Sequence, residues 1–116
     1  MSVIIYHNPR CSKSRETLVL LETRNLQPQV INYLQHPPTA EQLKSIFTQL
    51  SLTNVRDMMR RKEDIYKTLN LADPQLTDDA LFAAMAEHPI LIERPIVIAN
   101  QQARIGRPPE QVLDIL

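Results

Sequence analysis

The chain has 116 residues, 43% of them hydrophobic, and its 13 basic and 13 acidic side chains give a formal net charge of zero. This length supports one domain with one core and is too short for two, and a neutral chain has no overall field that would attract nucleic acid or a membrane surface. The single cysteine excludes an internal disulfide, a zinc site built on several thiolates and a two-cysteine redox motif.

The first predicted element is a buried strand over residues 3–6, an apolar run that ends at the turn residues Asn8 and Pro9. Leu18 and Leu21 then begin the apolar stripe of a helix. The only cysteine therefore lies at or near the N-terminus of that helix.

Cys11 is expected to be a reactive thiol in this position, because unpaired backbone N–H groups and the helix dipole stabilise an anion there. A free thiol with a pKa of ~8.5 is only about 3% ionised at neutral pH, so a decrease of roughly two units makes the thiolate the major form. The alternative is a small buried residue beside an ordinary helix cap. Basic side chains nearby would add positive charge, namely Arg10, Lys13 and Arg15, and His7 would add to it if protonated.

A second strand and a long helix are predicted next. The first helix should end near Asn25, which tolerates a left-handed cap, and residues 29–34 have the composition of a strand. A strand, a helix and a strand in succession form a parallel pair with a right-handed crossover. Residues 39–42 then have the pattern of a capping box. Apolar residues follow at helical spacing, namely Leu43, Ile46, Phe47 and Leu50.

Shorter elements complete the predicted order. Short helices are expected over residues 55–69 and 78–87. Residues 96–98 and 103–105 are typical of a hairpin, and the prolines at 108–109 begin a last helix. The order is β-α-β, a helical insertion and β-β-α.

This order, with a cysteine after the first strand and a proline entering the third, resembles the thioredoxin-like fold. The resemblance implies an α/β architecture with a central mixed four-stranded sheet, in a single domain over residues 1–116 with a helical insertion at about 39–89. The sequence is more closely similar to the glutathione- and glutaredoxin-coupled arsenate reductase family, over essentially the whole chain. The similarity rests on HNPRCSKSRET at 7–17, PPT at 37–39, HPILIERPIV at 88–97 and ARIGRPPEQVLDIL at 103–116.

The family resemblance implies roles for particular residues. It makes Cys11 the nucleophile and Pro95 the proline that the fold holds as a cis peptide facing the nucleophile. It also implies an oxyanion site of three arginines, which local context places at Arg60, Arg94 and Arg107. Arg61 is the alternative to Arg60, because a shift of the preceding loop by one residue would exchange them.

The implied reaction is the reduction of arsenate to arsenite. Guanidinium groups bind the oxygens of a tetrahedral oxyanion and neutralise charge that would repel a thiolate. Cys11 would attack arsenic, glutathione would attack the resulting adduct, and glutaredoxin would remove the glutathione and release arsenite. A single cysteine fits this scheme, because any disulfide must form with another molecule.

The sequence leaves two alternative roles open for several residues. His7 either tunes the thiolate or hydrogen-bonds its own turn, and Ser14 either donates to the thiolate or caps the helix. Gly106 permits either a bulge or a close backbone approach to an anion. Without the resemblance, the three arginines could also be ordinary solvated side chains or ion-pair partners of acidic neighbours such as Glu93 and Glu110.

Two other functions remain open. Cys11-Ser12-Lys13-Ser14 is the monothiol form of the glutaredoxin pattern, so a thiol transferase is one alternative, although it leaves three arginines unexplained. A non-enzymatic redox regulator that binds RNA polymerase is the other, although such proteins typically carry a Cys-x-x-Cys switch. A cysteine phosphatase is excluded, because its phosphate loop requires arginine six positions after the cysteine and this chain has Thr17 there.

Location and metal content are predicted from what the sequence lacks. No apolar segment is long enough to span a bilayer, and a first strand at Val3 leaves no room for a signal peptide, so a cytoplasmic protein is expected. A lone cysteine and three scattered histidines form no recognisable ligand set, so no metal is expected. CSKSRET and IGRPPE differ from the best-known resistance enzymes and are similar to a chromosomal branch of the family.

Overall fold

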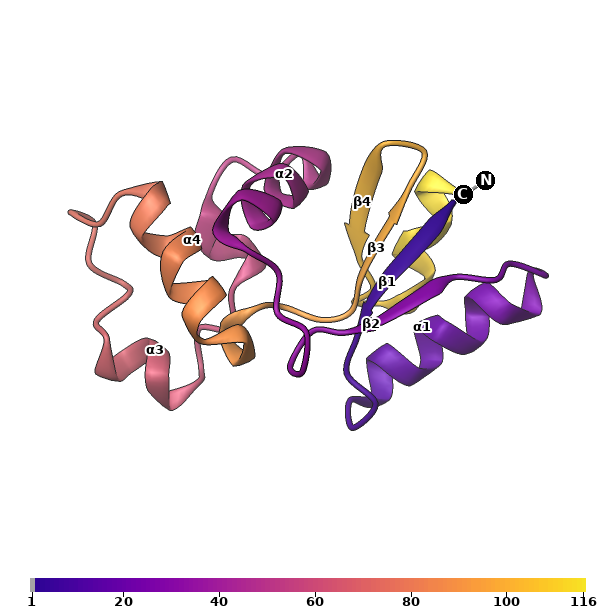
Figure 1. Ribbon diagram of the computed structural model, residues 1–116, viewed down its shortest axis with the longest axis horizontal. Helices are drawn as coiled ribbons and strands as arrows, with labels where there is room; N and C mark the ends of the chain where they lie inside the picture. The colour runs from indigo at the N-terminus through magenta and orange to yellow at the C-terminus, as the bar shows by residue number, and fades with distance from the viewer. Residues whose placement is uncertain (1) are drawn as a thin grey trace.

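The computed structural model describes residues 2–116, and its centre is one four-stranded sheet in the order β2-β1-β3-β4 (Figure 1). The strands are β1 (Val3–His7), β2 (Gln29–Asn32), β3 (Ile96–Ala99) and β4 (Gln102–Ile105). β1 and β2 are parallel, whereas β3 runs antiparallel to both β1 and β4. The prediction of a mixed four-stranded sheet is therefore confirmed.

One face of the sheet is covered by α1 (Ser12–Thr23) and by the C-terminal 3₁₀ helix η3 (Pro109–Ile115), which contact each other. The alternating residues of β1 and β3 point toward these helices, as the period of a strand requires. The resulting core cluster contains Val3, Ile5, Leu21, Val97, Ala99, Val112 and Ile115.

A helical region lies between β2 and β3 and packs on the other face of the sheet, with α2 against β4 (Figure 1). Its largest buried side chains form a second core cluster with Ile96 and Ala103 of the sheet. Its elements are α2 (Ala40–Leu50), η1 (Val55–Met58), α3 (Asp64–Thr68), α4 (Asp78–Glu87) and η2 (Pro89–Leu91).

Local sequence signals predicted several ends of these elements correctly. Thr39 and Gln42 form the capping box at the start of α2, with reciprocal side-chain to backbone hydrogen bonds of 2.9 and 3.1 Å. Asn25 has a left-handed φ of 61° just beyond α1. Asn100 and Gln101 both have positive φ, as a two-residue hairpin turn requires.

The predicted helix over residues 55–69 is wrong as one element. Met59 instead pairs with Ile92 in an isolated antiparallel bridge, and the Arg60 N–H donates to the Leu91 carbonyl at 2.8 Å. A continuous helix would need the same backbone groups for its own hydrogen bonds. Residues 55–69 therefore form two separate short helices, η1 and α3. Two smaller corrections concern β2, which ends at Asn32 rather than at residue 34, and the last helix, which is 3₁₀.

Among residues 2–116, the structure contains no helix of the length and apolar character needed to cross a membrane.

Gly106 is required by close packing rather than by an unusual φ, because its φ is not positive. A Cβ atom at this position would lie 2.6 Å from Thr17 Oγ1 and 2.9 Å from Pro95 Cγ. The N–H of Gly106 donates to the Pro95 carbonyl at 2.9 Å. Of the two sequence-based readings, the observed role is a close approach of the backbone, here to α1 and Pro95.

Gly106→Ala is therefore expected to lower the free energy of unfolding by about 1–3 kcal/mol, the usual cost of overpacking a closed site. Urea denaturation followed by circular dichroism measures this loss. Thr17→Ala removes one of the two obstacles, so the double variant should lose less than the sum of the single variants. A Gly106→Ala protein as stable as the wild type would show that this contact is not tight.

Candidate active site

Cys11 is the N-cap residue of α1, as the sequence predicted, with an extended backbone at φ −96° and ψ 123°. Its N–H donates to the Asn8 carbonyl at 3.0 Å, and its carbonyl accepts from the Arg15 N–H at 3.0 Å. The sulfur is partly exposed and does not meet the geometry of a side-chain cap, although the N–H groups of the first helical turn lie near it.

The pKa of the Cys11 thiol lies below its ordinary value. Burial raises the pKa, but the backbone N–H groups of Ser14 and Lys13 and the positive charge of Arg94 lower it by more. Hydrogen bonds from free N–H groups at a helix N-terminus stabilise the anion, as does a nearby guanidinium group. The thiolate form is therefore more favoured here than in a free cysteine.

The source of the positive charge differs from the sequence-based expectation. The Lys13 ammonium group pairs with Glu16 at 3.5 Å, and Arg15 donates to the Pro9 carbonyl at 3.0 Å, so both side chains have other partners. Burial and the charge of Arg15 lower the pKa of His7 below its ordinary value, which disfavours the protonated form that would add positive charge. The favourable charge comes instead from Arg94, which lies far along the chain.

His7 and Ser14 hold the loop that carries the cysteine. The Ser14 hydroxyl is fully buried, lies 2.6 Å from His7 Nδ1 and accepts a hydrogen bond from the Asn8 N–H at 3.0 Å. The hydroxyl is thus engaged with the turn, whereas the backbone N–H of Ser14 acts on the sulfur. Asn8 closes the same turn by accepting from the Arg10 N–H at 3.0 Å.

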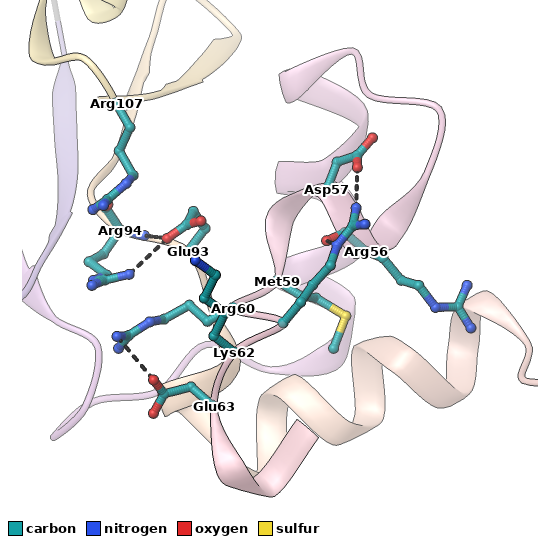
Figure 2. A pocket seen from close by; sticks show the side chains of 10 residues that line it. Arg56, Asp57, Met59, Arg60, Lys62, Glu63, Glu93, Arg94 and Arg107 are labelled. Atoms are coloured by element: carbon teal, nitrogen blue, oxygen red, sulfur yellow. Dashed lines mark hydrogen bonds and ion pairs between the residues drawn. The ribbon is translucent and has the colours of Figure 1, made fainter. Parts of the chain in front are cut away.

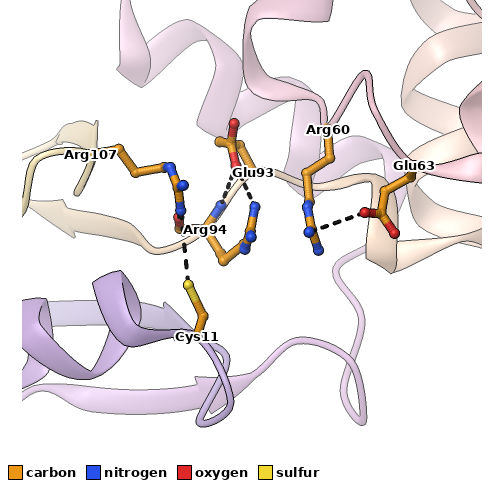
Figure 3. Close-up of polar contacts among 6 residues, drawn as sticks. All are labelled: Cys11, Arg60, Glu63, Glu93, Arg94 and Arg107. Atoms are coloured by element: carbon orange, nitrogen blue, oxygen red, sulfur yellow. Dashed lines mark hydrogen bonds and ion pairs between the residues drawn. The ribbon is translucent and has the colours of Figure 1, made fainter.

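The three predicted arginines line one cleft, with Arg107 and Arg94 next to Cys11 and Arg60 beyond Arg94 (Figure 3). Arg107 Nη1 lies 3.9 Å from Cys11 Sγ and donates to the Arg94 carbonyl at 3.3 Å. Arg94 pairs with Glu93 at 2.9 Å, and Arg60 pairs with Glu63 at 3.1 Å. Each of these two guanidinium groups is therefore held by a neighbouring carboxylate.

Arg61 has a different orientation from Arg60. It forms an ion pair with Asp57 and donates from Nε to the Arg56 carbonyl at 3.0 Å. Arg60 instead extends toward Arg94 (Figure 3). Of the two adjacent arginines, Arg60 is the one whose side chain lies with Arg94 and Arg107.

The arginines line a cleft of about 460 Å³. Figure 2 shows Arg107 and Arg94 at one end of this cleft and Arg56 and Asp57 at the other. Cys11 is not among the residues that line this cleft, which begins beside the sulfur at Arg94 and Arg107.

Two cis peptide bonds directly follow two of the arginines, Arg94-Pro95 and Arg107-Pro108. The first has the cis form expected of the proline that enters β3. The second was not predicted from the sequence. Among residues 2–116, no cluster of three His, Cys, Asp or Glu side chains is placed to hold a metal ion.

Two features of the site were missed at the sequence level. Glu63 was not singled out, although it follows Arg60 by three residues and forms an ion pair with it at 3.1 Å. Tyr33 was read as part of a strand, yet its buried hydroxyl is influenced by the charges of Cys11, Arg60 and Arg94. Its place at the carboxyl end of a strand parallel to β1 was the available signal.

Comparison with known proteins gives consistent matches over the whole chain. A family model described as the ArsC family matches residues 6–115. The "Arsenate reductase" of Haemophilus influenzae is 56% identical over the full length of both chains. "Uncharacterized protein YfgD" of Escherichia coli is 56% identical and is matched over 98% of this chain and 96% of its own. A solved structure titled "Arsenate reductase from Vibrio cholerae" superposes with a TM-score of 0.99 at 69% identity, covering 100% of this chain and 98% of that chain.

Proposed function

Because the chain belongs to the ArsC family, we propose that it is an arsenate reductase that uses the Cys11 thiolate as its nucleophile. The observation that carries the proposal is the lowered pKa of a partly exposed thiol whose sulfur lies 3.9 Å from one of three clustered guanidinium groups. A thiolate needs positive groups nearby before it can react with an anion.

The first step is attack of Cys11 on arsenic. Arg60, Arg94 and Arg107 bind the arsenate oxygens and neutralise part of the charge that would repel the thiolate. A sulfur–arsenic bond forms and one oxygen leaves as water, so arsenic stays in the +5 state in this adduct.

Reduction requires two external thiols, for which we propose glutathione and glutaredoxin. Glutathione adds to arsenic in the adduct with loss of a second water. A glutaredoxin thiolate then attacks the glutathione sulfur and forms a mixed disulfide with it. The bond between that sulfur and arsenic breaks, and its electron pair stays on arsenic and reduces it to +3. Water finally displaces the arsenic from Cys11 and releases arsenite.

We further propose that the 116 residues act as one domain in the cytoplasm, where glutathione is abundant, and that no metal takes part. The helical region between β2 and β3 contributes Arg60 to the site, and the sheet region contributes Cys11, Arg94 and Arg107. A site assembled from both regions requires that they fold together.

Arsenite production from arsenate tests this function. The purified protein is supplied with glutathione, glutaredoxin and a system that recycles both, and each thiol is omitted in turn. We expect arsenite only when both thiols are present. Failure of the folded protein to form arsenite, with turnover of a mixed-disulfide substrate, would favour a thiol transferase, and stable binding to RNA polymerase would favour a regulator.

A further inference from the structure

Two buried polar side-chain atoms, Tyr33 Oη and Arg94 Nε, have no hydrogen-bond partner among residues 2–116. No other side-chain nitrogen or oxygen in this described part of the chain is both buried and unpaired in this way. Native proteins pair the great majority of buried polar groups, and an unpaired one costs stability. Both exceptions belong to the candidate active site.

The fold places Tyr33 beside the cysteine loop. β1 and β2 are parallel, and His7 at the end of β1 is in register with Asn32 at the end of β2. Asn8 and Tyr33 are the residues that directly follow these two strands, so both lie at the carboxyl edge of the parallel pair. Ligands of open α/β sheets bind at this edge.

The surroundings of the Tyr33 hydroxyl are those of the oxyanion site. The residue is 1% exposed, and burial raises the pKa of its hydroxyl, which therefore keeps its proton at neutral pH. The charges of Arg94, Arg60 and Cys11 all act on this hydroxyl. The Asn8 side chain is close enough to the hydroxyl to lower its pKa, but the contact does not meet the geometry of a hydrogen bond. A neutral donor is therefore held among the charged groups of the site.

We propose that Tyr33 is a further substrate-binding residue, whose hydroxyl donates a hydrogen bond, together with Arg94 Nε–H, to one oxygen of the bound arsenate or of its adduct on Cys11. This inference rests on the proposed function. An oxyanion competes with Glu93 and Glu63 for the guanidinium groups of Arg94 and Arg60, so its arrival moves these side chains and admits an oxygen to the hydroxyl.

Tyr33→Phe tests the inference, because it removes the hydroxyl and keeps the ring. The rate at which iodoacetamide alkylates Cys11 is measured by mass spectrometry at increasing arsenate concentration, without glutathione or glutaredoxin. Each variant is normalised to its own rate without arsenate. We expect the arsenate concentration that gives half-protection to rise about tenfold in Tyr33→Phe, since a hydrogen bond to a charged ligand is lost.

Tyr6→Phe is the matched control. Tyr6 lies on β1, and burial is the cause that raises the pKa of its hydroxyl, without the charges that act on Tyr33. The control should be protected by arsenate at the wild-type concentration. Thermal unfolding without ligand gives a second readout, in which Tyr33→Phe should unfold at a temperature no lower than the wild type, because the lost hydroxyl had no partner.

The outcomes separate this inference from the function on which it rests. If arsenate gives half-protection at the same concentration in the wild type and in Tyr33→Phe, the role of Tyr33 is refuted and the proposed function stands. The same conclusion follows if this concentration rises equally in Tyr33→Phe and Tyr6→Phe. A lower unfolding temperature for Tyr33→Phe would also refute it, because the hydroxyl would then be bonded within the protein. If arsenate does not protect even the wild type, both proposals fail.

Discussion

Cys11→Ser is expected to reduce arsenite formation by at least about 10³-fold, as the loss of a nucleophile does in other enzymes. A serine hydroxyl stays protonated at neutral pH and cannot form the sulfur–arsenic bond on which the later thiol steps depend. The fold should be unaffected, because the Cys11 side chain makes no capping hydrogen bond. Arsenite formation with glutathione and glutaredoxin measures the loss, and circular dichroism checks the fold.

A displaced thiol is the matched control for this variant. Cys11→Ser combined with Ser12→Cys keeps one cysteine at the start of α1 but moves it away from the N-cap position. The double variant should be as inactive as Cys11→Ser, because Arg107 Nη1 lies 3.9 Å from the sulfur at position 11. Wild-type activity in the double variant would mean that any thiol at the start of this helix suffices.

Arg94→Ala is expected to lower kcat/KM for arsenate by about 10²–10³-fold, the usual effect of removing one donor from an oxyanion site. Two losses combine in this variant. The oxyanion loses a guanidinium partner, and the Cys11 thiolate loses the positive charge that lowers its pKa. Arg94→Lys should recover part of the activity, because lysine restores the charge but not the planar pair of donors. Steady-state kinetics with varied arsenate measure each effect.

Arg60 and Arg61 provide an internal control for the arginine cluster. Arg60→Ala should also lower kcat/KM, whereas Arg61→Ala should stay within about twofold of wild type, because Arg61 is paired with Asp57 at the surface. A larger loss in Arg61→Ala than in Arg60→Ala would show that the two side chains exchange places when arsenate binds.

The parts of the fold that depend on local sequence were predictable. A short apolar run, an Asn-Pro turn and a helical stripe place Cys11 at a helix N-terminus without reference to the rest of the chain. The capping box at Thr39 is equally local. Each of these features is decided by residues within one turn or strand, which is the range over which sequence patterns are informative.

The parts that depend on distant segments were not predictable in the same way. The break after Met58 results from pairing with the segment around Ile92, and no pattern within residues 55–69 records that partner. The pKa of His7 is lowered by burial and by the charge of Arg15, and neither effect can be read from the residues around position 7. The choice of Arg60 over Arg61 required the side-chain ion pairs.

The arginine cluster shows most clearly which features the local sequence does not predict. Arg94 and Arg107 precede prolines in separate segments, and nothing in either segment alone indicates that they meet beside Cys11. Their grouping was expected from the family resemblance, whereas the carboxylates that hold Arg60 and Arg94 came from the structure. Tyr33 was missed because a tyrosine after a strand is ordinarily a core residue.

The most direct test of the account is the pH dependence of Cys11 alkylation by iodoacetamide. Only the thiolate reacts, so the rate rises with pH around the pKa of the thiol. We predict a midpoint clearly below that of a cysteine-containing peptide measured alongside, and a shift back toward the peptide value in Arg94→Ala, since the charge of Arg94 lowers the pKa. A wild-type midpoint equal to that of the peptide would contradict the central claim that this site holds a thiolate.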